Sequence, residues 1–438
     1  MNSERDQSFG NDKTQKPFDS GHSNQRSNGN SQSNNNPNTQ QSQVKTKPRE
    51  PPKKKRMWVK GLAILVIAFL LIAIFFGPLS HLTAPLWGGP VYPETAKFTI
   101  ERSISLSTDR EINYTVNAPR PFDIPGNDIQ YIRDLEWNED PVLGDKFGQD
   151  WMFWTDTLDG GSTHDITITY QVETSTVKWG YSSQHSGTVD DIDQGLKDRY
   201  NRDQWTVTDR DGNPEDRNGD GRDDVMIEPS HPTIRNLAEQ ITEGEDNLYD
   251  KSRAIYRWIT NNIDYERGAP GLPQHAYWTL DTRLGDCDEQ AFLFISLARA
   301  VDIPAWTELG VLYDRVLNEW GGHGWIRMQF VDDAGNSGWV NIDTTNRQFF
   351  ARDATRITTW IDDGIEGHLE EYYYFLNYTY TGAPPDVSIS DQYQNLQMET
   401  EGQVYLGDDG FDMPWVGFAI MTPTIVIFSF IWEKKKKR

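Results

Sequence analysis

Apolar and polar residues alternate in several short runs between about residues 95 and 175. The runs are KFTIERSISL, INYTV, IQYIRDL and DITITYQVE, and turns rich in Gly, Pro, Asn and Asp separate them. A period of two places every second side chain on the same face of a strand. This part of the chain therefore predicts a small β-sandwich.

Farther along the chain the apolar period becomes that of an α-helix. Residues 232–242 and 247–263 each predict an amphipathic helix, and a third segment, from Cys287 to Val301, is apolar on nearly every face, as in a core helix. The runs GWIRMQFV and SGWVNID follow, with turn residues 332–337 between them. They predict a β-hairpin behind the buried helix.

Two longer apolar runs lie near the two ends of the chain. The first extends from Trp58 to Phe76 and the second from Trp415 to Trp432, and a basic cluster adjoins the outer end of each. About 20 apolar residues span a hydrocarbon core, and basic residues stay on the cytoplasmic side. We therefore expect two transmembrane helices, both termini in the cytoplasm, and an extracytoplasmic region between them.

Charge is distributed unevenly along the chain. Residues 1–50 are rich in Ser, Asn, Gln and Gly and lack an apolar period, which predicts a disordered tail. Residues 61–432 hold 60 acidic and 25 basic residues, a formal net charge of −35. Such a surface repels nucleic acid and suits a hydrated exterior.

The chain contains one cysteine, Cys287, so a disulfide within the chain is excluded. Taken alone, a single cysteine is more often a buried core thiol than a reactive group. Its context changes that interpretation, because Cys287 begins the buried helix. A helix N-terminus stabilises a thiolate through its dipole and its free N–H groups, and the N–H of Cys287 is a natural oxyanion donor.

The predicted hairpin supplies the two other groups that a cysteine nucleophile needs. His323 begins the first strand and Asp343 ends the second, so the two are expected to be cross-strand neighbours. An imidazole would take the proton of Cys287, and a carboxylate would fix the tautomer of that imidazole. The alternatives are a structural histidine, a turn aspartate, or a metal site of the three residues, which no short-range ligand pair supports.

A separate loop has the spacing of a calcium-binding loop. Oxygen-bearing side chains occupy positions 1, 3, 5 and 9, a glycine occupies position 6, and a carbonyl is available at position 7. The expected ligands of a structural Ca²⁺ are Asp216, Asn218, Asp220, Arg222 and Asp224. Position 12 is Ile227 where a bidentate Glu is usual, and a solvated acidic turn is the alternative.

The stretch from about 232 to 346 resembles the transglutaminase-like superfamily core. The matching features are GDC on a buried helix, IPAW after it, HGW, and WVNIDTT. The resemblance implies an α+β, papain-like fold and a triad of Cys287, His323 and Asp343. It implies amide cleavage or acyl transfer on protein or peptide substrates, and hydrolysis and crosslinking remain equally open.

Two other functions are compatible with the same residues. One is a catalytically inactive surface module that binds or scaffolds, and the other is a membrane-tethered sensor. The expected organisation combines all these segments. It is a tail (1–57), a membrane helix (58–77), a β-rich domain (90–180), an acidic linker (181–231), a catalytic core (232–350), an extension (351–412), a membrane helix (414–432) and a basic tail (433–438).

Overall fold

The computed structural model describes residues 3–4 and 91–406, except residues 127, 210–211, 267–272 and 316. The two predicted membrane helices and the basic C-terminal tail lie outside these residues, as does the N-terminal tail apart from residues 3–4. In the part that is described, no helix combines the length and the apolar character needed to cross a bilayer.

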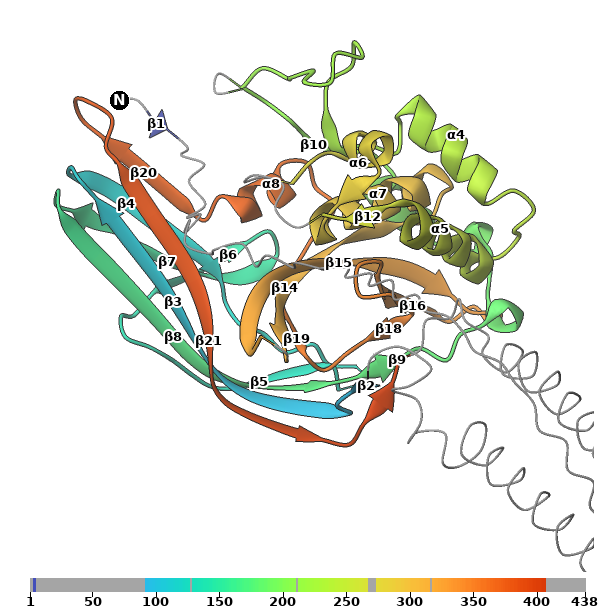
Figure 1. Cartoon of the computed structure of the whole chain (residues 1–438), viewed down its shortest axis with the longest axis horizontal. Helices are drawn as coiled ribbons and strands as arrows, with labels where there is room; N and C mark the ends of the chain where they lie inside the picture. Colours follow the sequence, from blue (N-terminus) through green and yellow to red (C-terminus); the bar gives the residue numbers. More distant parts are fainter. Residues whose placement is uncertain are drawn as a thin grey trace, which may run out of the picture. The chain divides into compact units, whose positions relative to one another are not determined.

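Two antiparallel sheets form a sandwich around one apolar core (Figure 1). The first sheet has the strand order β21-β3-β8-β5, and the second has the order β1-β20-β4-β7-β6. These strands are β1 (Ser3–Glu4), β3 (Thr95–Thr108), β4 (Ile112–Pro119), β5 (Gln130–Trp137), β6 (Val142–Lys146), β7 (Gln149–Leu158), β8 (Ser162–Ser175), β20 (Leu376–Tyr380) and β21 (Val387–Glu401).

Strand β3 shows how the alternating pattern builds the sandwich. Every second side chain from Ala96 to Thr108 is buried, as its period of two predicts. One of these inward positions holds Arg102, whose guanidinium donates to both carboxylate oxygens of Asp391 on β21, at 2.9 and 2.6 Å. The pair satisfies a charge that would otherwise be buried alone.

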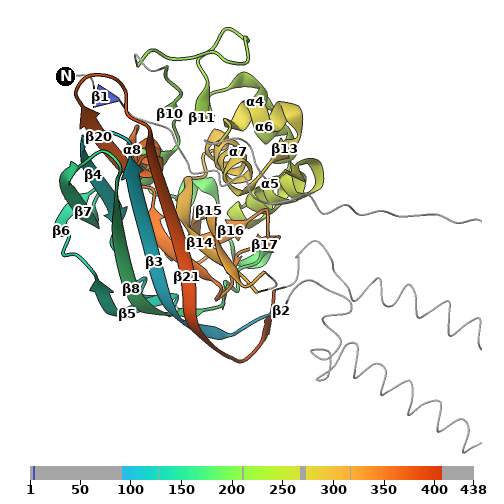
Figure 2. The same cartoon turned by 60° about the vertical axis from the view of Figure 1, so that its left-hand side comes forward.

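A third antiparallel sheet, with the order β17-β16-β15-β14-β19, carries helices on one face (Figures 1 and 2). Helix α7 packs against β14 and β15, and α4, α5 and α6 pack around α7. Side chains of β14 and β19 also join the sandwich core. The elements are α4 (Pro232–Ile241), α5 (Leu248–Asn262), α6 (Ala276–Thr282), α7 (Cys287–Ala300), β14 (Ala305–Asp314), β15 (Glu319–Val331), β16 (Ser337–Asp343), β17 (Gln348–Phe349) and β19 (Arg356–Ile361).

Short elements connect these layers. Three pairs of two-residue strands form small separate sheets, and β10 and β11 form a small hairpin between residues 204 and 227. They are β2 (Val91–Tyr92) with β22 (Val404–Tyr405), β9 (Val177–Lys178) with β18 (Ala351–Arg352), β12 (Asp264–Tyr265) with β13 (Leu284–Gly285), and β10 (Gln204–Thr206) with β11 (Val225–Ile227). Within the described residues, the other helices are two 3₁₀ turns (Ser183–His185 and Val189–Asp191), α3 (Gln194–Tyr200) and α8 (His368–Tyr373).

The mixed α and β architecture and the elements around the cysteine agree with the sequence prediction, but the connections between regions differ. The segments 90–180 and 351–412 do not form separate sheets, because β20 pairs with β4 and β21 pairs with β3 along its whole length. The run YYYFLNYTYTG has a strand-like composition, yet its first part ends helix α8 and only its second part forms β20. Alternation reports the face of a strand and not its partner, so these long-range pairings were not predictable.

Candidate active site

Cys287 is the first residue of helix α7, and a capping box fixes its position. The Asp286 carboxylate accepts the N–H of Asp288 at 3.1 Å, and the Glu289 carboxylate accepts the N–H of Asp286 at 2.9 Å. Beyond this turn, all residues from Glu289 to Arg299 are buried. The reciprocal cap and the buried helix together give the cysteine a rigid base.

The sulfur of Cys287 lies against strand β15 at Gly324. The backbone N–H of Gly324 acts to lower the pKa of the thiol, and Gly324 directly follows His323 in the chain. A Cβ on residue 324 would lie 2.2 Å from Oδ1 of Asp288, in the first turn of α7. Glycine is therefore what lets the start of α7 approach β15 so closely.

His323 is buried and contacts Asp343 at the end of β16. The distance from His323 Nε2 to Asp343 Oδ2 is 2.6 Å. With the carboxylate ionised, Nε2 carries the proton of this bond and the lone pair remains on Nδ1. Asn346 donates its backbone N–H to Oδ1 of Asp343 at 2.8 Å and its side-chain amide to Oδ2 at 3.0 Å. The ring of His323 also stacks on buried Trp325, with centroids 5.7 Å apart.

A buried arginine keeps Asp343 ionised. Burial by itself would raise the pKa of Asp343, but Nη1 of Arg356 lies 2.7 Å from its Oδ2. This pair, with His323, holds the pKa of Asp343 well below its usual range. Arg356 also pairs through Nε with Asp353 at 3.0 Å. Asp343 is thus a permanent anion that orients the imidazole at neutral pH.

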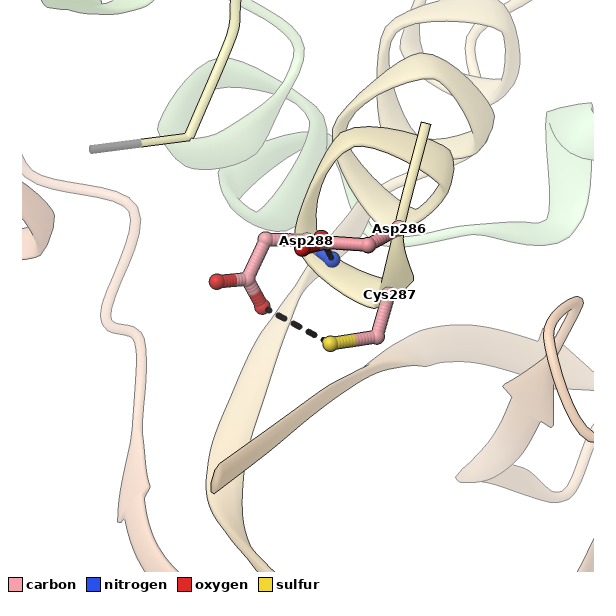
Figure 3. A group of neighbouring side chains, drawn as sticks. All are labelled: Asp286, Cys287 and Asp288. Carbon is pink, nitrogen blue, oxygen red and sulfur yellow. Dashed lines mark hydrogen bonds between the residues drawn. The ribbon is translucent and has the colours of Figure 1, made fainter. Parts of the chain in front are cut away.

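The thiol of Cys287 has acidic neighbours, whereas Asp343 has a basic one. Figure 3 shows Asp288 turned toward Cys287, with its Oδ1 3.7 Å from the sulfur. Burial raises the pKa of the Cys287 thiol well above its usual range, and Asp288 and Asp286 raise it further. Desolvation and the two nearby carboxylates thus act against the thiolate that the helix N-terminus would favour. A stabilised thiolate at Cys287 stays a prediction.

Asp288 is itself perturbed. Its Oδ2 accepts a hydrogen bond from the hydroxyl of Tyr373 on α8 at 2.8 Å. Burial, with the charge of Asp286, raises the pKa of Asp288 to about 6, while Tyr373 and His323 act in the opposite direction. Asp288 contacts the phenol of Tyr373 and the thiol of Cys287, whereas Asp343 contacts the guanidinium of Arg356.

The structure brings His323 and Asp343 into direct contact and places the start of the cysteine helix beside Gly324, the residue after His323. Sequence reasoning missed Arg356, Asn346, Asp288 and Tyr373. Two of these residues have a signal in the sequence: Asp288 is the residue directly after Cys287, and Asn346 directly follows the WVNIDTT motif. Arg356 and Tyr373 come from later elements, and no local pattern marks them.

The calcium-like loop has a different arrangement. Both oxygens of Asp216 accept backbone N–H groups, from Gly219, Asp220 and Gly221. Asp220 and Asn218 likewise accept N–H groups within the loop, at Arg222 and Asp220 respectively. Buried Asp224 accepts from the backbone of Arg217 and the amide of Asn218. The loop oxygens thus turn toward its own N–H groups.

The carboxylates of this loop do not converge on a common point. Among the residues that the structure describes, the trio of His, Cys, Asp or Glu side chains whose ligand atoms all lie within 4.8 Å is Asp286, Cys287 and Asp288 (Figure 3). Calcium binding at residues 216–224 would need carboxylate oxygens to exchange N–H partners for an ion, and it remains a prediction.

Residues 235–344 match the sequence model of the transglutaminase-like superfamily. Over 188 residues the chain is 24% identical to YebA, an uncharacterized protein of Bacillus subtilis strain 168. The match takes in 38% of this chain and 23% of YebA, so the chain spans less than a quarter of that relative's length.

Two solved structures are also similar. One is a candidate cysteine protease from Cytophaga hutchinsonii, at 16% identity and a TM-score of 0.48, covering 73% of this chain and 97% of that protein. The other is the periplasmic domain of TgpA from Pseudomonas aeruginosa, at 16% identity and a TM-score of 0.27, covering 56% of this chain and 87% of that domain.

Proposed function

We propose that this chain, in which residues 235–344 form a domain of the transglutaminase-like superfamily, is a cysteine-dependent amide hydrolase or acyltransferase. Cys287 is the nucleophile, His323 is the general base and acid, and Asp343 orients His323. The observation that carries the proposal is the 2.6 Å contact between His323 and Asp343 on the strands beneath the start of the cysteine helix. This contact engages Nε2 and leaves Nδ1 as the ring nitrogen that can take a proton.

The reaction follows from these positions. His323 Nδ1 takes the proton of Cys287 as the sulfur attacks an amide carbonyl carbon, and the carbonyl π electrons move to the oxygen. The C–N bond then breaks, the proton passes from His323 to the leaving amine, and a thioester remains on Cys287. Water or a second amine attacks the carbonyl carbon of this thioester, and His323 takes the proton of the attacking group. The C–S bond then breaks, the acyl product leaves, and the proton returns from His323 to the sulfur of Cys287.

The N–H of Cys287 supports the charge that develops on the carbonyl oxygen. It belongs to the first turn of α7, whose N–H groups have no acceptor within the helix. A donor in that position points out of the helix end, beside the nucleophile's own side chain. The raised pKa of the thiol favours proton transfer to His323 during the attack.

The setting of the reaction is a further part of the proposal. The apolar runs at 58–76 and 415–432, each with an outer basic cluster, support anchoring of the chain to a membrane with both termini in the cytoplasm. The acidic region between them would then face the outside, where protein or peptide substrates are available. The calcium-like loop at 216–224 would hold a structural ion there.

The test uses the full chain with a protein substrate and a fluorescent primary amine. Hydrolysis yields new amino termini or ammonia, and acyl transfer yields a fluorescent substrate. We expect at least one product, and we expect Cys287→Ala to abolish it. Equal product from wild type and Cys287→Ala would contradict the proposal. Absence of product, together with no acyl adduct on Cys287, would favour the inactive surface module.

A further inference from the structure

Asp288 occupies an unusual place beside the nucleophile. One of its carboxylate oxygens lies 3.7 Å from the sulfur of Cys287, and the other accepts the 2.8 Å hydrogen bond of Tyr373. The carboxylate therefore bridges the thiol and a phenol (Figure 3 shows its contact with the sulfur). A thiol that approaches a carboxylate in this way acts as the donor, because an ionised carboxylate only accepts.

The neighbouring strand leaves Asp288 little freedom. Residue 324 has no Cβ, and one built there would lie 2.2 Å from Oδ1 of Asp288 and 3.1 Å from Leu309. The carboxylate thus fills the space against β15 that glycine provides. Any larger residue at 324 would displace it from the sulfur.

The second support of Asp288 comes from outside the superfamily domain. Tyr373 ends helix α8, which lies beyond residue 344, and its ring lies 5.2 Å from that of Trp205. The region after the catalytic core therefore delivers a hydroxyl to the active site. This contact joins residues 85 positions apart in the chain.

The groups that face Asp288 come from three elements. They are Cys287 on α7 with Asp286 at its N-cap, His323 on β15 and Tyr373 on α8. Three of them, Asp286, Cys287 and Tyr373, bring no positive charge, and Asp286 adds a negative one. Charge at this point is therefore unfavourable, and a second anion at the sulfur would be more so.

We propose that Asp288 is a further active-site residue. Its carboxylate, oriented by Tyr373, accepts the S–H of Cys287 in the resting protein and opposes negative charge at that sulfur. The inference rests on the proposed role of Cys287 as the nucleophile. Asp288 keeps the nucleophile protonated until a substrate and His323 take the proton together, and it disfavours reagents that carry an anion next to the reacting carbon.

The test measures the alkylation of Cys287 by two reagents of similar size and different charge. Iodoacetamide is neutral and iodoacetate is an anion, and intact mass reports each reaction without ambiguity because the chain has a single cysteine. Rates are measured from pH 5 to pH 9. Wild type should react with iodoacetate more slowly, relative to iodoacetamide, than free cysteine does.

Two variants, one of the carboxylate and one of the phenol, should each raise the alkylation rate of Cys287. Asp288→Asn keeps the shape and removes the charge, so the iodoacetamide rate at pH 7.5 should rise about tenfold, which corresponds to about one pKa unit. The iodoacetate rate should rise more. Tyr373→Phe frees the carboxylate and should give a smaller rise, about threefold, the effect of one modest hydrogen bond.

Tyr372→Phe is the matched control, because it removes a phenol one residue earlier whose partner is Thr359. It should react as wild type does. An unchanged or lower rate in folded Asp288→Asn, or no charge discrimination in wild type, would overturn the proposal. If Asp288→Asn fails to fold, two measurements still test the proposal: the ratio of iodoacetate to iodoacetamide rates in wild type, and the rates of Tyr373→Phe. Loss of turnover in His323→Ala is a separate result that bears on the proposed function alone.

Discussion

Two carboxylates near the active site, Asp343 and Asp288, are handled in opposite ways. Asp343 is buried against Arg356, and its pKa lies well below the usual range. Asp288 is bonded to Tyr373 and Cys287, and burial raises its pKa to about 6. The comparison shows that the partner, rather than burial itself, decides how readily a carboxylate loses its proton. Asp343 is ionised far below neutral pH, and Asp288 is ionised only as the pH rises through about 6.

The largest expected effect separates the orienting role of Asp343 from its structural role. Asp343→Asn should lower kcat/KM by about 10³- to 10⁴-fold, because the imidazole loses the group that fixes its tautomer. Asp353→Asn is the matched control, since it also removes a carboxylate from Arg356. Both variants should lose stability in thermal unfolding. Equal activity in the two variants would contradict the assignment.

The same exchange of carboxylate for amide should have opposite effects on stability at two other positions. Glu308 pairs with Arg327 at 2.7 Å and with Arg352 at 3.0 Å, all three buried. Glu308→Gln leaves two guanidinium groups without a counter-ion and should cost about 3–5 kcal/mol of unfolding free energy at pH 7.5. Asp288→Asn should leave the unfolding free energy at pH 7.5 unchanged or raise it. Urea unfolding checks both, and a large loss at Asp288 would break the comparison.

Asp288 and Glu308 should also give the protein's stability opposite dependences on pH. The pKa of Asp288 is raised, so its contribution is full below pH 4 and is lost as the pH rises through about 6. Wild type should lose about 1 kcal/mol relative to Asp288→Asn between pH 4 and pH 7.5, a value reduced for partial exposure. The pKa of Glu308 is lowered to about 2, so its contribution is present above pH 4 and is lost below that. Unfolding curves of the variants against pH should therefore diverge in opposite directions.

A smaller effect is expected at the calcium-like loop, where backbone N–H groups meet the carboxylates. If calcium replaces those partners, millimolar Ca²⁺ should raise the thermal midpoint by a few degrees through its preference for the folded state. Asp216→Asn combined with Asp220→Asn should remove the rise. Arg199→Gln, a change outside the loop, should leave it intact. No response in wild type would leave these carboxylates as a solvated turn.

The sequence predicted contacts within one element or between adjacent elements better than contacts between distant segments. The apolar run after Cys287 and the hairpin from His323 to Asp343 were predictable, because each pattern lies within one or two adjacent elements. The pair of Asp343 with Arg356 was not, since Arg356 follows on a strand with no motif. The contact of Asp288 with Tyr373, and the completion of the sandwich by β20 and β21, join segments that no periodicity connects.

The central claim is that Cys287 forms an acyl intermediate with His323 as its base. The most direct test mixes the full chain with an activated ester that releases a chromophore, and follows both the release and the intact mass. Wild type should give a burst and an acyl group on Cys287, Cys287→Ala should give neither, and His323→Ala should acylate about 10² to 10⁴ times more slowly. Acylation of His323→Ala at the wild-type rate, or a burst from Cys287→Ala, would contradict the account.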